Sequence, residues 1–250
     1  MGAVTSGWVD VTYLGQSTFL FATPESRRVL VDPWTVRNPL CPEDWRGLHD
    51  VDLILVTHGH HDHLGDLFAI AAQASPTVVA VVELGKWLSA HGVRKVQTMN
   101  LGGIIERYGV TLAMTPAAHS SSVDDDPFAY IGPAAGFVLG FSNGARVYHA
   151  GDTAAFAGME LIHRVHRPQL ALLPIGDHHT MMADEAAVAV ELLQVDRVVP
   201  MHYGVTPGSA SAPGQFSSAL AARGLGHVET HPLRPGQTVR LDGDGRLHQC

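Results

Sequence analysis

The fold of this chain is decided by the stretch Leu53-Ile-Leu-Val-Thr-His58-Gly-His60-His-Asp62-His63, where an apolar run leads directly into a cluster of histidines. A short apolar run of this kind is typical of a buried strand. Alternate residues of an extended chain point the same way, so His58 and His60 can converge on one ion. Asp62 and His63, where the chain turns into a helix, can converge on a second. The stretch therefore predicts a metal site at the end of a buried strand.

Four residues supply at most two ligands to each ion, so further ligands must come from elsewhere in the chain. Side chains that directly follow other strands are the best candidates, because they lie on the same rim. Taken alone, each such residue is more often structural, but several at strand ends favour metal binding over a solvated histidine-rich loop. The candidates are His119 after strand 111–115, Asp152 after strand 145–150 and His202 after strand 198–201.

Around the cluster, β-branched strands alternate with alanine-rich helices. We expect strands at 9–14, 18–22, 29–32, 53–57, 77–82, 95–99, 111–115, 136–141, 145–150, 170–174, 198–202 and within 227–247. We expect helices at 64–74, 83–91, 156–164, 184–195 (with Asp184 as N-cap) and 213–223. Both halves show hairpins followed by strand–helix alternation, and no linker is longer than a loop. The pattern predicts one α/β (α+β) domain over residues 1–250, a four-layer αββα sandwich of two facing mixed β-sheets with helices outside.

Composition excludes several classes of protein. The 16 Lys and Arg against 24 Asp and Glu give a net charge of −8 without a basic cluster, which argues against a nucleic-acid partner. No apolar run approaches the roughly 20 residues of a membrane-spanning helix, and no secretory signal is visible, so we expect no stable membrane anchor. Two cysteines cannot form a disulfide framework, and a reducing cytoplasm fits this.

The ordered motifs resemble the metallo-β-lactamase superfamily. Within it, the chain resembles the compact metal-dependent hydrolases related to ascorbate-6-phosphate lactonase and to N-acylphosphatidylethanolamine-hydrolysing phospholipase D. The resemblance implies the αββα fold and covers most of the chain, from about Val11 to Tyr203. It rests on His-x-His-x-Asp-His at 58–63, Leu14-Gly-Gln-Ser-Thr-Phe19, Val31-Asp-Pro-Trp34, His119-Ser-Ser, Gly151-Asp-Thr and Pro200-Met-His-Tyr203.

The resemblance also implies the ligand set for two divalent ions. It assigns His58, His60 and His119 to the first ion, Asp62, His63 and His202 to the second, and Asp152 to a bridge between them. Aspartate at position 152, where the antibiotic-hydrolysing members often have cysteine, speaks against β-lactam hydrolysis and for a lactonase- or phosphodiesterase-like enzyme. Mixed imidazole and carboxylate ligands suit zinc, with manganese, nickel or iron as alternatives.

The expected reaction is hydrolysis of a small-molecule ester, lactone or phosphodiester by a hydroxide shared between the two ions. Asp62 is expected to ligate and also to orient this nucleophile. His178 and His179 follow another strand and are candidates for protonating the leaving group or orienting the substrate. Asp32 is either a hydrogen-bond partner of a metal histidine or a turn residue before proline.

Alternatives remain open at this point. They are a thioester hydrolase of the glyoxalase type, an oxygen-using iron enzyme and a non-catalytic metal-binding protein. The loops around 124–133 and 206–214 are expected to shape the pocket, with Trp34, Tyr203 and residues 120–122 as candidate walls. Related enzymes often self-associate, so a homo-oligomer is a further expectation.

Overall fold

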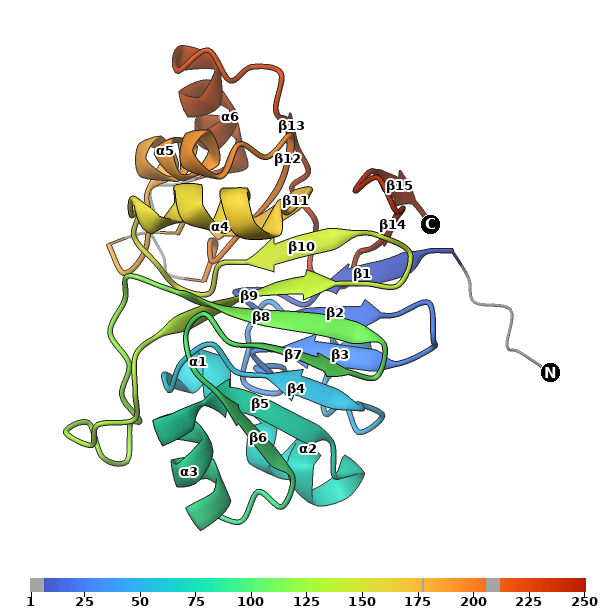
Figure 1. Cartoon of the computed structure of the whole chain (residues 1–250), viewed down its shortest axis with the longest axis vertical. Coiled ribbons are helices and arrows are strands. Elements are labelled where there is room, and N and C mark those ends of the chain that lie inside the picture. Colours follow the sequence, from blue (N-terminus) through green and yellow to red (C-terminus); the bar gives the residue numbers. More distant parts are fainter. Residues whose placement is uncertain (1–6, 177, 206–211) are drawn as a thin grey trace.

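Two β-sheets face each other and helices cover their outer sides in the computed structural model, which describes residues 7–176, 178–205 and 212–250 (Figure 1). This is the four-layer αββα sandwich that the sequence predicts. No helix in the described part of the chain is long and apolar enough to cross a membrane.

The first sheet has eight strands in the order β15-β14-β1-β2-β3-β4-β5-β6. Neighbours from β15 to β3 pair antiparallel, and those from β3 to β6 pair parallel. The strands are β1 (Val9–Tyr13), β2 (Phe19–Ala22), β3 (Arg28–Val31), β4 (Leu53–Leu55), β5 (Thr77–Val81), β6 (Val96–Met99), β14 (Thr238–Leu241) and β15 (Leu247–Gln249).

The second sheet has seven strands in the order β13-β12-β11-β10-β9-β8-β7. The neighbours β10 to β13 pair parallel, and those from β7 to β10 pair antiparallel. As a result β8, β10, β11 and β12 run in the same direction and end at one edge. The strands are β7 (Ile104–Arg107), β8 (Val110–Pro116), β9 (Ala135–Gly140), β10 (Arg146–His149), β11 (Leu170–Pro174), β12 (Arg197–Met201) and β13 (Glu229–Thr230).

The helices form the two outer layers. In Figure 1, α2 and α3 lie against the first sheet, and α4, α5 and α6 lie against the second. The helices are α1 (His61–Leu64), α2 (Leu67–Ala74), α3 (Val82–Ala90), α4 (Gly158–His166), α5 (Ala183–Leu193) and α6 (Pro213–Ala222), with a short 3-10 helix η1 (Glu43–Trp45).

Strand β11 shows why the central strands are apolar at every position. Leu170 and Leu172 belong to the core between the sheets, whereas Ala171 and Leu173 belong to the core under α4–α6. Successive side chains of a strand point to opposite faces, so a strand covered on both sides needs an unbroken apolar run. The facing sheets therefore share a single central core.

Two expectations about helices were wrong. The helix expected at 64–74 is divided into α1 and α2, because Gly65 has φ 42° and the Asp66 backbone N–H donates to Pro33 O at 2.7 Å. Asp184 does not cap α5, since Met182 occupies the N-cap position and Asp184 lies in the first turn. Strand β7, exposed at most of its positions, was not predicted because it lacks an apolar run.

Candidate metal centre

The predicted ligands gather where strands of both sheets end. His58 lies just beyond β4, and Asp152 and His202 follow β10 and β12 of the second sheet. His119 follows β8, which runs in the same direction as β10 and β12. The shared edge of the sandwich therefore brings together residues that are far apart in the sequence. All seven predicted ligands fall into two compact groups, in each of which the potential ligand atoms lie within 4.8 Å of one another.

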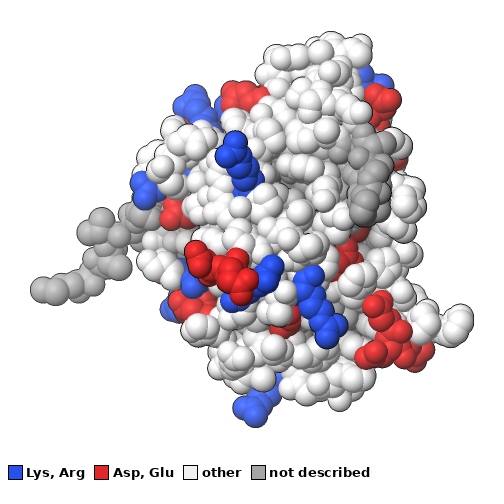
Figure 2. All heavy atoms as spheres, turned by 180° about the vertical axis from the view of Figure 1, so that it is seen from behind, with Lys and Arg blue, Asp and Glu red and all other residues white. Residues whose placement is uncertain are grey.

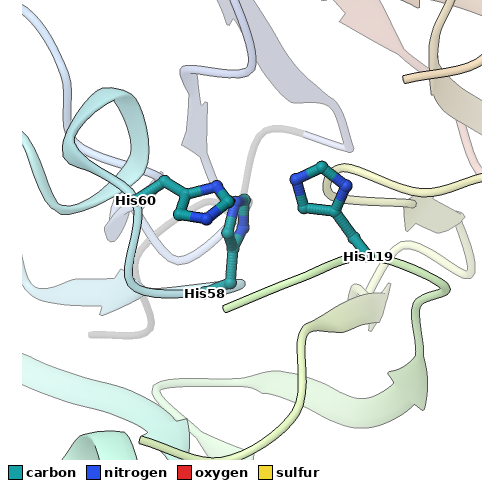
Figure 3. Close-up of side chains that lie close together, drawn as sticks. All are labelled: His58, His60 and His119. Carbon is teal, nitrogen blue, oxygen red and sulfur yellow. The ribbon is translucent and has the colours of Figure 1, made fainter. Parts of the chain in front are cut away.

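The first group consists of His58, His60 and His119. Figure 3 shows the three imidazoles turned toward a common space, with His119 reaching it from the opposite side to His58 and His60. The ring centroid of His58 lies 4.5 Å from that of His60 and 5.0 Å from that of His119. His58 is fully buried and the other two are partly buried.

The hydrogen bonds of Thr57 set the tautomer of His58. The Thr57 hydroxyl donates to Asp32 Oδ2 at 2.8 Å, so its oxygen accepts the Nδ1 proton of His58 at 3.0 Å. The Nε2 lone pair of His58 then faces His60 Nδ1 at 2.9 Å. Two lone pairs at this distance repel unless a proton or a cation lies between them.

The second group consists of Asp62, His63, Asp152 and His202. The Oδ2 atom of Asp152 lies 3.0 Å from His202 Nε2 and 3.2 Å from His63 Nε2. The same oxygen is 3.8 Å from His119 Nε2 of the first group. One carboxylate therefore reaches both groups.

Burial lowers the pKa of all three imidazoles in the first group, and it holds the pKa of His58 well below its usual value. A depressed pKa keeps the imidazole neutral at pH 7. Neutral imidazole is the form that offers a lone pair to a metal. The first group is therefore in the protonation state of a ligand set.

In the second group burial disfavours the charged form of each side chain, but the attraction between carboxylates and imidazoles outweighs this effect of burial. His63 and His202 hold the pKa of Asp152 well below its usual range. The carboxylates of Asp152, Asp62 and Asp32 raise the pKa of His63 well above its usual value. The pKa of Asp62 is also lowered, against burial, chiefly by His63. Ionised carboxylates concentrate negative charge here, which favours a cation.

Asp32 is fully buried and contacts a histidine of the cluster directly. Its Oδ2 lies 2.7 Å from His63 Nδ1, and its Oδ1 accepts the backbone N–H of Thr57 at 2.9 Å. A proton on Nδ1 leaves the Nε2 lone pair of His63 directed at the second group. Of the two interpretations left open by the sequence, the contacts support the partner of a histidine.

Gln16 and Ser17 are residues of the site that the sequence analysis did not assign. Gln16 Nε2 donates to Asp62 Oδ2 at 3.1 Å, and Ser17 Oγ donates to Asp152 Oδ1 at 3.3 Å. Both residues belong to the turn between β1 and β2, and Gln16 O also accepts the backbone N–H of His202 at 2.8 Å. Their only signal was their place in Leu14-Gly-Gln-Ser-Thr-Phe19, a stretch that contributes to the resemblance to the superfamily but is locally typical of a hairpin turn.

Three residues around the site have a left-handed backbone, which side chains other than glycine rarely adopt. They are Gln16 (φ 56°) in the turn between β1 and β2, and Asp32 (φ 50°) and His202 (φ 57°), which directly follow β3 and β12. Such backbone strain gathers at functional sites when the surrounding structure holds it in place. It also explains why the strand expected at 198–202 ends at Met201.

A cavity of about 360 Å³ opens over the two groups, and its wall includes Asp62, Asp152 and His202. His179 borders this cavity. His178 is exposed and its ring lies 4.0 Å from that of His179, but it is not part of the described wall.

Of the other residues expected to form the cavity wall, some line the cavity and others do not. Trp34, Ser120 and Asp124 line the cavity, whereas Tyr203 packs against the core under α4–α6. Of the loop 206–214, residues 206–211 lie outside the described part of the chain.

The donor set fits divalent cations. Three imidazoles with lowered pKa values form one group, ionised carboxylates and two further imidazoles form the other, and one carboxylate reaches both groups. A fold of two facing sheets with such a centre at the strand ends defines a metal-dependent enzyme of the αββα class.

Comparison with known proteins defines the family. The model of the beta-lactamase superfamily domain matches residues 27–203. A UPF0173 metal-dependent hydrolase of Koribacter versatilis is 43% identical over 231 residues, which are 92% of this chain and 97% of that one. Another from Rubrobacter xylanophilus is 42% identical over 235 residues, covering 93% and 97% of the two chains. The chain belongs to the UPF0173 metal-dependent hydrolases of the metallo-β-lactamase superfamily.

Solved structures agree with this assignment. A metallo hydrolase of the archaeon Ignicoccus hospitalis superposes with a TM-score of 0.82 and 34% identity, over 94% of this chain and 99% of that one. An isothiocyanate hydrolase from Delia radicum gut bacteria has a TM-score of 0.68 and 18% identity over 92% and 97% of the chains, and it shares the fold. The chain is therefore a metal-dependent hydrolase, as its motifs predicted.

Proposed function

We propose that this hydrolase uses two divalent ions to cleave a small ester, lactone or phosphodiester. The observation that carries the proposal is the reach of Asp152 Oδ2, which lies close to imidazoles of both groups. In the proposed arrangement, His58, His60 and His119 hold one ion, Asp62, His63 and His202 hold the other, and Asp152 bridges them.

Zinc is the proposed ion because imidazole and carboxylate ligands suit it, with manganese, nickel and iron as competitors. A bound pair of such ions supplies a nucleophilic water at neutral pH and Lewis acidity toward the substrate oxygen.

Asp62 has the position needed to orient the nucleophile. Its carboxylate borders the cavity and is ionised, and Gln16 Nε2 donates to its Oδ2. This hydrogen bond restrains the carboxylate in one orientation, so that it can accept a hydrogen bond from a water beside the substrate. Asp62 therefore combines the proposed roles of ligand and catalytic residue.

A proton for the leaving group is the remaining requirement, and His178 and His179 are the proposed sources. His179 is the better placed, because it borders the cavity. Replacement of His179 by Gln is expected to lower kcat/KM by about 10²- to 10⁴-fold. His178→Gln is the matched control at the neighbouring position, and the double substitution tests both residues together. Unchanged kcat/KM in the double variant would remove this role from both.

The substrate is proposed to be a small molecule rather than a nucleic acid. The chain carries a net charge of −8, and a polyanion needs a basic surface. On the face drawn in Figure 2, basic side chains are scattered rather than gathered into one patch.

The decisive experiment combines metal analysis with a substrate panel. Elemental analysis of the purified protein is expected to find two transition-metal ions per chain. The loaded protein is then tested on p-nitrophenyl esters, lactones and bis-p-nitrophenyl phosphate, with zinc or manganese added. Asp62→Asn is expected to lose activity while both ions are retained. Protein that carries no metal and gains no activity when supplied with it would refute the proposal.

A further inference from the structure

A second, larger cavity of about 640 Å³ adjoins the metal cavity. The two share Trp34, His61 and Asp124 as lining residues, so they lie side by side. A volume of this size is typical of a small-molecule site. None of the proposed metal ligands lines the second cavity, and its chemistry is therefore separate from that of the ions.

The wall of this cavity is built from aromatic side chains of three different elements. Trp34 follows β3, Phe68 lies on α2 and Trp87 lies on α3. The Phe68 and Trp87 rings meet edge to face with centroids 5.9 Å apart. Phe68 is 38% exposed although it is large and apolar. Trp34 is buried, whereas Phe68 and Trp87 keep aromatic surface exposed beside the candidate metal site, which indicates a binding surface for an apolar group.

The local backbone holds the wall in place. Asp66 Oδ2 accepts hydrogen bonds from the backbone N–H groups of Thr35 and Val36 at 2.6 and 2.7 Å. A Cβ at Gly65 would lie 2.4 Å from Pro33 O and 2.6 Å from Trp34 Cα, so only glycine allows this approach. The interruption between α1 and α2 thus positions Trp34 immediately beside the metal motif.

Charged side chains also line the cavity, namely Arg37, Asp66, Asp124 and Asp125. His61 Nδ1 is 3.6 Å from Asp124 Oδ2, and both side chains are 67% exposed. Arg37 is exposed and makes no ion pair with any residue in the described part of the chain. The cavity therefore combines aromatic surface with a few polar groups, which is the usual lining of a small-molecule site.

We propose that this cavity binds an apolar acyl chain of the substrate while the scissile ester lies in the metal cavity. The inference rests on the proposed function and narrows its substrate class to esters with an acyl group of medium length. Each additional methylene buried against the aromatic wall is expected to raise kcat/KM about fourfold until the cavity is full.

The test uses 4-nitrophenyl acetate, butanoate, hexanoate and octanoate with metal-loaded enzyme. Ala69 is exposed on α2 and lines the cavity, so Ala69→Phe fills it without disturbing the core. Ala72 is exposed on the same helix outside the cavity wall, and Ala72→Phe is the matched control. Wild type and Ala72→Phe are expected to prefer longer chains, whereas Ala69→Phe is expected to lose this preference. An equal dependence of kcat/KM on acyl-chain length in wild type, Ala69→Phe and Ala72→Phe would overturn the inference.

Binding of 1-octanol to the metal-free protein separates this inference from the proposed function. Trp34 and Trp87 line the cavity and supply a fluorescence signal. We expect a saturable change of tryptophan fluorescence with 1-octanol in wild type and Ala72→Phe, and at least tenfold weaker octanol binding in Ala69→Phe. Saturable octanol binding without hydrolysis of any ester, lactone or phosphodiester would refute the proposed function and leave the apolar binding site supported. Hydrolysis without chain-length preference and without octanol binding would refute the proposed acyl-chain site and leave the proposed function intact.

Discussion

Replacement of Asp32 by Asn is expected to change the metal-binding tautomers of one histidine in each group. The backbone N–H of Thr57 donates to Asp32 Oδ1 at 2.9 Å and cannot turn away, so the amide oxygen must take that position. The amide NH₂ then faces His63 Nδ1, which was 2.7 Å from Oδ2. Nδ1 must now accept a hydrogen bond, and its proton moves to Nε2, where it blocks the lone pair needed by a metal.

The effect extends to His58 through Thr57. The Thr57 hydroxyl donates to Asp32 Oδ2 in the native protein, but it must accept a hydrogen bond from the amide in the variant. Its proton then turns toward His58 Nδ1, 3.0 Å away, which also becomes an acceptor. Loss of a supporting partner of a metal histidine typically weakens metal binding by about 10- to 100-fold. We therefore expect a loss of this size at both groups from one substitution.

Two measurements check this prediction. Competition with a chromophoric chelator gives the zinc affinity, and ¹⁵N NMR of the metal-free protein reports which ring nitrogen carries the proton. Asp52→Asn is the control, because Asp52 also accepts a backbone N–H, that of Arg28 at 2.9 Å, but at the opposite end of β4. Both variants lose charge-assisted hydrogen bonds, each worth about 1.5–3 kcal/mol of unfolding free energy. Unchanged zinc affinity and Nδ1-protonated His63 in Asp32→Asn would refute the reasoning.

Three further predictions follow from the same structure. Chelation of the ions should abolish hydrolysis, and metal restored at 100 times its Kd should raise the unfolding free energy by about 2.7 kcal/mol, seen as a higher Tm. Gly176→Ala should weaken metal binding at the second group about tenfold in calorimetric titration, because a Cβ at position 176 would lie 2.1 Å from His202 O. Gly214→Ala is the control and should bind metal normally, because a Cβ at position 214 would have no atom within 4 Å. Burial raises the pKa of Cys41 to about 11, so at pH 8 only about one thousandth is thiolate and a thiol reagent should label Cys250 alone. Labelling of Cys41 should accelerate as the pH rises toward 11; rapid labelling of both thiols at pH 8 in the folded protein would contradict the assigned burial.

Much of the metal centre could be predicted because its signals are local. Alternation along an extended chain places His58 and His60 on one side, and the helix start follows at once. Residues such as Asp152 and His202 could be proposed because they directly follow apolar strands. Strands that run in one direction end at one edge of a sheet, so this simple positional rule proposed side chains that the structure brings into two compact groups.

The supporting contacts could not be predicted in the same way. Gln16 reaches Asp62 across 46 residues of sequence, and Ser17 reaches Asp152 across 135. Their turn carries the ordinary composition of a hairpin connection. The division of the expected 64–74 helix was equally hidden, because it depends on hydrogen bonds from Thr35 and Val36 to Asp66.

By itself, the sequence determined the layered fold and the strand-end positions of the candidate ligands, because hydrophobic periodicity and residue spacing act over a few neighbouring residues. The tertiary structure alone decided that Asp152 reaches both groups, that Asp32 lies against His63 Nδ1, and that an aromatic cavity adjoins the candidate metal site. These features depend on hydrogen bonds and packing between segments that meet only after the two sheets close on each other.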